Sequence, residues 1–174
     1  MIKRLVDQHI AKAKDQRYGP EYNFGATYYD ARDEAIRRGD RTIGTEHLVL
    51  ALLVDPDSPA ARAIGRDLDS ARSALDVLDR EALSAIGVKP GMSAGPIAVR
   101  AQGRLRLTPA AKAVLTDIRD ARTRKNRAAG LGKVLDALLA LRPPDPAAEL
   151  LAALGIEASE VRRRFAELEG DSQP

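Results

Sequence analysis

The feature of this sequence that most constrains its fold is an imperfect internal duplication. At one constant offset, residues 33–35 align with 119–121, Gly44 with Gly130, Leu48 with Val134, and 51–53 with 137–139. One inserted residue brings 57–61 onto 144–148. Self-similarity over a unit of this length is the mark of a tandem repeat, in which each copy forms the same supersecondary structure. The sequence therefore predicts two superimposable halves.

Within each half, apolar residues recur at spacings of three and four, which predicts helices. For the first copy we expect a helix over 22–38 that ends at Gly39 and a buried helix over 46–53 with Thr45 as its N-cap. A third helix begins at Pro59, and a fourth covers 68–83. Strand patterning is nearly absent, and nothing in the sequence predicts a sheet.

The second copy repeats this order with different residues. Thr108 and Pro109 predict the cap and first turn of its first helix, and a buried helix is expected over 134–141. Pro146 opens the third helix, and the fourth begins near Glu157 or Ser159. Its expected core residues are Leu150, Leu151, Leu154 and Ile156. The predicted fold class is therefore all-α, with two tandem four-helix pseudo-repeats.

An extra amphipathic segment precedes the repeats and a breaker-rich segment divides them. Residues 2–14 place Leu5, Val6, His9, Ile10 and Ala13 on one helical face. Glycine and proline concentrate in 87–96, which no helix tolerates. We accordingly expect a helical extension at 1–19, the first repeat at 20–86, a linker at 87–106, a degenerate second repeat at 107–169 and a disordered tail at 170–174.

Composition excludes several classes of chemistry. The 174 residues include no cysteine, which excludes disulfide frameworks and thiolate metal sites, and only two histidines, whose spacing predicts no metal site. No apolar run approaches the ~20 residues of a membrane span, and no secretory signal is visible, so we expect a cytoplasmic protein without a membrane partner.

Two strings resemble catalytic motifs, but neither of them predicts an enzyme. Residues 130–133 resemble a phosphate-binding loop, but Arg127 stands at its first glycine and Val134 at its magnesium-binding hydroxyl. Residues 91–95 match Gly-x-Ser-x-Gly, but both histidines precede Ser93 and Pro96 stands where a helix would begin. We therefore expect no catalytic residue and no cofactor.

The net charge of +3 favours nucleic acid only weakly. Positive charge is concentrated in 87–107 and in the run 162–164, and neither stretch contains an aromatic residue on which a base could stack. We regard nucleic acid as an unfavoured partner. A regulatory nucleic-acid-binding protein that uses these two stretches stays the alternative function.

At residues 43–53, followed by 58–61, the sequence closely resembles the repeat of the Clp ATPase N-terminal domain family. Residues 107–115 and 146–156 resemble the start and the end of the same repeat, so that the resemblance covers about 22–168. It implies an all-α domain that recruits substrates and adaptor proteins to an AAA+ unfoldase. Since the motor is missing, the chain looks like a stand-alone ClpC-like N-domain, acting as an accessory or a competitor in Clp-dependent proteolysis.

The resemblance also implies a ligand site. In ClpC-type members, the Thr-Glu pair of each Gly-Thr-Glu-His string helps to bind phosphorylated arginine, and Thr45 and Glu46 match that pair. The second copy has 131–133, Leu-Gly-Lys, which lacks the hydroxyl and the carboxylate. Leu107 stands where the family often has a phenylalanine of a hydrophobic groove, and Tyr22 falls one position after the equivalent in the first copy.

Each candidate residue also has a structural interpretation. Thr45 can cap the buried helix while Glu46 favours its positive end, and His47 is expected to be a packed or hydrogen-bonded residue. Five aromatic residues lie close together in the sequence: Tyr18, Tyr22, Phe24, Tyr28 and Tyr29. They form either part of the core, packed against the N-terminal segment, or a peptide-binding surface to which Tyr22, Phe24 and Tyr28 contribute with Leu107. The carboxylates of Asp30, Asp33 and Glu34 are expected on an exposed face, paired with Arg37 and Arg38.

Overall fold

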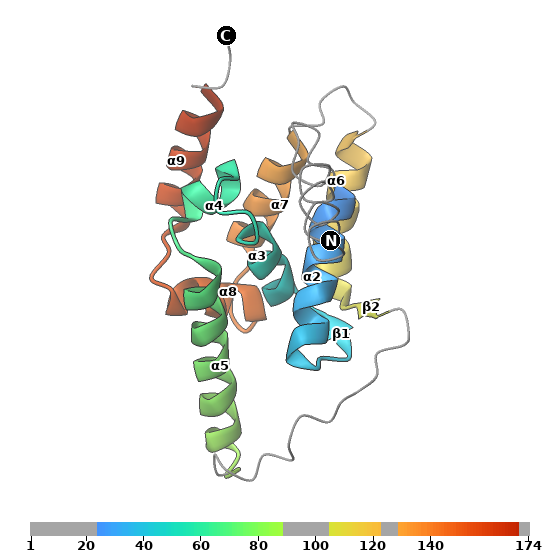
Figure 1. Cartoon of the computed structure of the whole chain (residues 1–174), viewed down its shortest axis with the longest axis vertical. Helices are drawn as coiled ribbons and strands as arrows, with labels where there is room; N and C mark the ends of the chain where they lie inside the picture. Colours follow the sequence, from blue (N-terminus) through green and yellow to red (C-terminus); the bar gives the residue numbers. More distant parts are fainter. Residues whose placement is uncertain (1–23, 89–104, 123–128, 171–174) are drawn as a thin grey trace, which may run out of the picture.

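The computed structural model describes residues 24–88, 105–122 and 129–170, which form eight helices and two very short strands. The first copy contains α2 (Phe24–Arg38), β1 (Thr42–Ile43), α3 (Thr45–Leu52), α4 (Pro59–Ile64) and α5 (Leu68–Ala85). The second contains β2 (Arg106–Leu107), α6 (Pro109–Arg122), α7 (Ala129–Ala140), α8 (Pro146–Ala153) and α9 (Ala158–Gly170), as Figure 1 shows.

Local signals set most of the helix ends. Gly39, with φ of 80°, ends α2 in the left-handed conformation that glycine adopts without steric cost. Ser58 caps α4 by accepting a hydrogen bond from the Ala61 amide, and Thr108 does the same for α6 through the Ala111 amide. Proline occupies the first turn of α4 and α8, where its missing amide proton costs no helical hydrogen bond.

The contacts between helices follow an approximate two-fold relation between the copies. Helix α2 packs on α3 as α6 packs on α7, and α4 packs on α9 as α8 packs on α5, while α3 and α7 meet at the centre. The core is made by the nearly all-buried helix α3 together with α7 and α8, through residues such as Leu50, Leu138 and Leu150. The prediction of two tandem four-helix pseudo-repeats is thereby confirmed.

Of the core expected in the second copy, Leu150 and Leu151 are buried, and Leu154 and Ile156 are partly buried against the same cluster. Two helices are longer than expected: α5 continues two residues beyond Leu83, and α7 begins at Ala129 rather than near Val134.

The absence of strand patterning predicted no sheet, and on this point the structure differs. Strands β1 and β2 pair in parallel, Thr42 with Arg106 and Ile43 with Leu107, and the Thr108 amide donates to the Ile43 carbonyl at 2.9 Å. Two residues are too short to produce a period-two pattern, so the sequence carried no signal for them. This strand pair connects the residues directly before α3 with the residues directly before α6.

The carboxylates expected on an exposed face of α2 are in part buried, and that expectation was wrong for two of them. Asp30 is 4% exposed and Glu34 is 5% exposed, whereas Asp33 is exposed. Glu34 does pair with Arg37, as expected, but it also binds Arg72 of α5. Arg38 binds Asp40 and two aspartates of α5 instead. Burial here follows from the packing of α2 on α3, with Arg72 of α5 reaching Glu34, and no local pattern reveals this.

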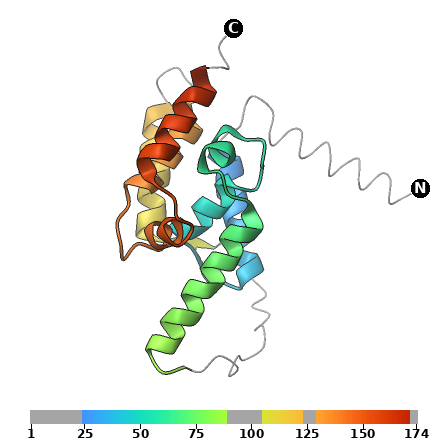
Figure 2. The ribbon, with the colours of Figure 1, turned by 90° about the vertical axis from the view of Figure 1, so that its left-hand side faces the viewer.

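Helix α5 extends beyond the body of the bundle, in green at the bottom of Figures 1 and 2. Its first half contributes Ala71 and Leu75 to the core, but every residue from Asp79 to Val88 is exposed. No helix in the described part of the chain is both long and apolar enough to cross a bilayer. The expected extension, most of the linker and the tail lie outside the described residues.

Candidate ligand-binding site

The string 44–47 forms the start of α3 and lies at the junction of the two copies. Gly44, in an extended conformation, is the N-cap, so the expectation that Thr45 caps this helix was wrong: Thr45 is its first helical residue. Glycine has no side chain to accept the first amide protons. When the His47 ring is neutral, its Nδ1 instead accepts a hydrogen bond from the Gly44 amide at 3.0 Å.

The Thr45 hydroxyl connects this helix to the second copy. It donates to Oδ1 of Asp145 at 2.7 Å and accepts from the Ala147 amide at 3.3 Å, and the residue is buried. Asp145 is itself the N-cap of α8, accepting from the same amide at 2.9 Å. Thr45 therefore completes the cap of a helix 100 residues further along the chain.

The Glu46 side chain folds back over Gly44. Its Oε1 lies 3.0 Å from Nδ1 of His47, and its Oε2 is buried without a hydrogen-bond partner among the described residues. A Cβ added at Gly44 would overlap this carboxylate, so a larger residue there would require the Glu46 side chain to move. The carboxylate thus has one oxygen bound to the helix start and one buried oxygen without a partner among the described residues.

His47 is 1% exposed and bound on both sides, as the expectation of a hydrogen-bonded structural residue requires. Its Nε2 lies 2.9 Å from Oδ2 of Asp40. Burial acts to lower the pKa of His47, but the hydrogen bonds and charges of Asp40 and Glu46 outweigh it and raise the pKa to about 9. In the charged ring Nδ1 donates to Glu46; in the neutral ring it accepts from Gly44.

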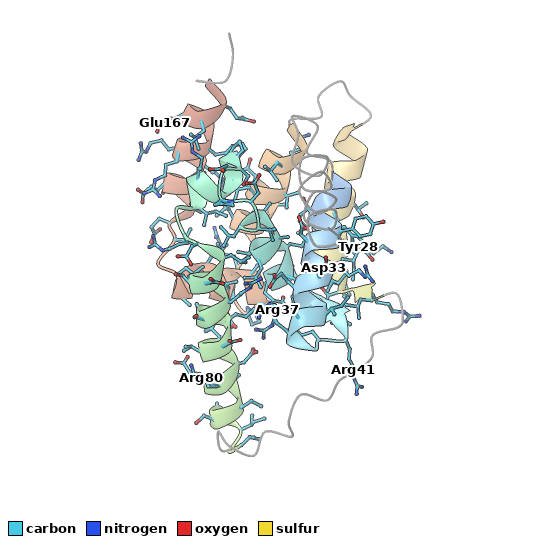
Figure 3. The ribbon with its side chains drawn as sticks, in the orientation of Figure 1. Tyr28, Asp33, Arg37, Arg41, Arg80 and Glu167 are labelled. Carbon is cyan, nitrogen blue, oxygen red and sulfur yellow. The ribbon has the colours of Figure 1, made fainter. Side chains whose placement is uncertain are left out.

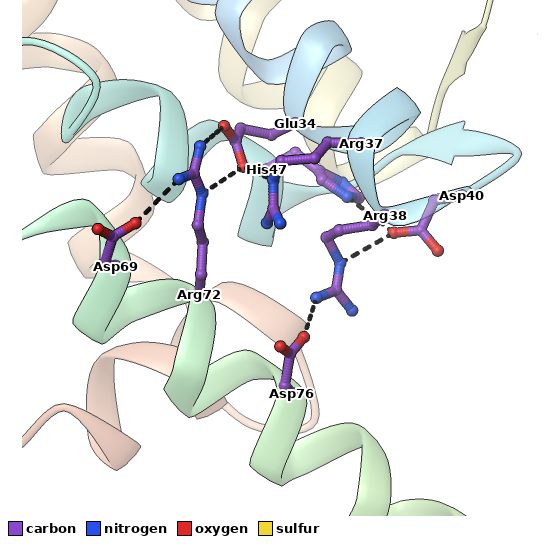
Figure 4. A network of polar contacts seen from close by, with 8 residues as sticks. All are labelled: Glu34, Arg37, Arg38, Asp40, His47, Asp69, Arg72 and Asp76. Carbon is purple, nitrogen blue, oxygen red and sulfur yellow. Dashed lines mark hydrogen bonds and ion pairs between the residues drawn. The ribbon is translucent and has the colours of Figure 1, made fainter. Parts of the chain in front are cut away.

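A chain of charged contacts continues from His47 to α5, as Figure 4 shows. Arg38 binds Asp40 at 3.2 Å and Asp76 at 2.8 Å and also contacts Asp79. The hydrogen bond from His47 lowers the pKa of Asp40, and the charge of Arg38 adds to that effect against the opposing effect of burial.

A second ion pair joins α2 to α5. Arg72 of α5 binds both oxygens of Glu34, with Nη2 at 2.5 Å and Nε at 3.1 Å. Burial alone raises the pKa of Glu34, but the hydrogen bonds from Arg72 and Arg37 outweigh it, so the pKa lies below its usual value. The candidate site is therefore held by a charged framework of α2, α3 and α5.

The equivalent position in the second copy is filled by an aromatic ring. Gly132 lies against Phe165 of α9, and a Cβ added there would be 2.8 Å from the ring. A shallow groove of about 310 Å³ between α7 and α9 is lined by these two residues and by Lys133, Asp136, Arg162 and Glu169. Gly132, at the position equivalent to Glu46, has no carboxylate, and of the two acids that line the groove Asp136 pairs with Arg162.

The remaining candidates are more dispersed. Leu107 pairs with Ile43 in the short sheet. Because Ile43 is two residues before Thr45, Leu107 lies next to the candidate site. Tyr28 is partly buried and meets Tyr29 edge-on at 5.4 Å between ring centroids. Tyr22 and the side chain of Phe24 lie outside the described residues.

The basic run 162–164 lies on α9, and the motif-like string 130–133 lies on α7. Arg162, Arg163 and Arg164 each bind a carboxylate, of Asp136, Glu167 and Glu160 respectively, so this run presents no block of unpaired positive charge. The string 130–133 forms the first turn of α7, and Arg127 and Val134 still stand where a phosphate-binding loop needs a glycine and a hydroxyl. Within the described ranges, no cluster of His, Asp or Glu is arranged to hold a metal ion.

Three residues around the candidate site were not predicted from the sequence: Asp145, Asp40 and Arg72. Asp145 had a usable signal, since an aspartate directly before a helix-opening proline is a typical N-cap. Asp40 and Arg72 had none, because they reach His47 and Glu34 only through the tertiary fold.

Comparison with known proteins agrees with this geometry. The family model of the Clp repeat (R) N-terminal domain matches residues 24–140, which cover both Thr45–Glu46 and the degenerate string of the second copy. A search of curated proteins gave no match. The match spans well over half of the chain, and the chain therefore belongs to the Clp repeat N-terminal domain family.

Proposed function

We propose that this chain is a cytoplasmic, non-enzymatic module that binds a protein or peptide and acts as an accessory or a competitor in Clp-dependent proteolysis. The observation that carries the proposal is the family membership over 24–140. The domain of this family is a non-catalytic module that binds substrates and adaptors of Clp unfoldases. The charged framework supports a binding role, because it holds the start of α3 in one arrangement.

We further propose that Glu46 is the residue that binds a ligand of the phosphoarginine type, with Thr45 holding the helix start in place. A carboxylate binds a guanidinium through paired charged hydrogen bonds, and the Oε2 oxygen of Glu46 has no partner to lose. Thr45 already donates its proton to Asp145, so it contributes to the site by position. Gly132 offers no such oxygen, and the proposal is therefore one site per chain.

The experiment is a titration with free phosphoarginine, followed by NMR of the amides of 43–50 and by calorimetry. Wild type is compared with Glu46→Gln, which keeps the shape and removes the charge, and with Glu149→Gln, an exposed glutamate in the first turn of α8. We expect binding by wild type and Glu149→Gln and a loss of more than tenfold in Glu46→Gln. Equal affinity in all three proteins would contradict the role of Glu46.

The role in proteolysis needs a separate measurement. Tagged wild-type protein is used to recover partners from a lysate of the source cells. Recovery of Clp subunits supports delivery of substrates to the unfoldase, while recovery of substrates alone supports competition with it. Recovery of neither contradicts the proposed module.

A further inference from the structure

The exposed end of α5 carries an apolar stripe that continues the one buried in the core. Leu68, Ala71 and Leu75 face the bundle, and the same helical spacing continues through Leu78, Ala82 and Ile86. Ile86 is 75% exposed and Leu83, beside the stripe, is 47% exposed. A stripe that changes from buried to exposed without a change of pattern indicates that another element covers its outer part.

The edge of this stripe is acidic. Asp76 and Asp79 share one guanidinium, that of Arg38, and Glu81 has no ion-pair partner among the described residues. On this part of the helix Arg80 is the only basic residue, and its Nε donates to a backbone carbonyl. The exposed end of α5 therefore fits an amphipathic helix that is basic.

One segment of the chain itself has this chemistry. Residues 2–14 combine the face described above, which has four apolar residues and His9, with Lys3, Arg4, Lys12 and Lys14 against a single carboxylate, Asp7. The linker after α5 is also basic, but its glycines and prolines prevent the regular spacing that a helical stripe needs. Apolar spacing and charge together favour the N-terminal segment.

The chain between residue 14 and α2 is long enough to let residues 2–14 reach the outer half of α5. The last residue of α2, Arg38, contacts Asp76 and Asp79, so the 15-residue length of α2, about 22 Å, separates Phe24 from the level of these aspartates. Residues 15–23 span up to about 30 Å when extended. A helix of residues 2–14 can therefore lie along the outer half of α5 of the same chain.

We propose that residues 2–14 dock in cis, as an amphipathic helix, on the stripe formed by Leu78, Ala82, Leu83 and Ile86. The contact places basic residues from the two sides of the segment's apolar face beside Asp79 at one edge of the stripe and beside Glu81 at the other. This contact meets the charged framework at Asp79, which binds Arg38, and does not include Glu46.

The chain contains no cysteine, so a single introduced thiol can carry a nitroxide label. The label at Ser84→Cys lies on the exposed end of α5, and a control label at Glu167→Cys lies on α9 at the opposite end of the molecule, as the positions of Arg80 and Glu167 in Figure 3 show. We expect the first label to remove amide signals of residues 2–14 and the second to leave them. Unchanged signals, or loss in 92–104 instead, would overturn the proposal.

Two further variants test the stripe and the assignment to one chain. In the Ser84-labelled protein, Ile86→Asp should restore the signals of 2–14, while Ser73→Asp, which adds the same charge on the far side of α5, should not. Equal effects of both would contradict docking on the stripe. Signal loss in a mixture of labelled, NMR-silent protein and unlabelled, isotope-enriched protein would show that the segment comes from a second copy and would overturn docking in cis.

Discussion

His47 makes the stability of the bundle depend on pH in a direction that follows from its neighbours. Asp40 and Glu46 raise its pKa from 6.5 in the unfolded chain to about 9 in the fold, against the effect of burial. A group whose pKa is higher in the folded state stabilises the fold fully below the unfolded pKa, and this stabilisation disappears as the pH rises through the folded pKa. We therefore expect the free energy of unfolding to fall between about pH 6.5 and pH 9.

The size of the effect follows from the shift. At about 1.4 kcal/mol per pKa unit, the charged His47 contributes about 3 kcal/mol at neutral pH. Urea unfolding followed by circular dichroism at several pH values measures this contribution as the difference between wild type and His47→Gln. The difference should be largest below pH 6.5 and smallest above pH 9.

NMR titration of the imidazole rings checks the cause directly, since the chain has only two histidines and His9→Gln assigns the signals. Asp40→Asn should lower the pKa of His47, whereas Asp33→Asn, an exposed aspartate on α2, should leave it unchanged. A His47 pKa at or below 6.5 would refute the reasoning, because it would mean that the hydrogen bond from the Gly44 amide keeps the ring neutral.

Three further substitutions test the framework by urea unfolding. Thr45→Val removes the bond to Asp145 and should cost about 1 to 2 kcal/mol, whereas the exposed Thr42→Val should change little. Arg72→Ala leaves buried Glu34 with Arg37 alone and should cost about 2 kcal/mol, against less than about 0.5 kcal/mol for Arg80→Ala on the same helix. Gly132→Ala pushes a methyl group against Phe165 at a cost of about 1 to 3 kcal/mol, which the helix preference of alanine offsets by up to about 1 kcal/mol, while Gly170→Ala meets nothing; equal costs within any pair would contradict the corresponding contact.

The site could be predicted in part. The string Gly44–His47 was found from its likeness to the family repeat, and His47 was correctly expected to be a structural residue. The predicted role of Thr45 was wrong, because a threonine before an apolar run is a typical N-cap. In the structure the N-cap is Gly44, and the Thr45 hydroxyl binds Asp145, the N-cap of α8. Local preference identifies where a helix begins, but not which distant helix a side chain reaches.

The sequence by itself determined the all-α class, the duplication and most helix ends, because periodicity, caps, prolines and glycines act within a few residues of the chain. Only the tertiary structure decided that Asp30 and Glu34 are buried, that Thr45 joins the two copies, and that Phe165 fills the place over Gly132. These facts depend on which helices lie side by side, and burial and ion pairing are properties of that arrangement rather than of any one segment.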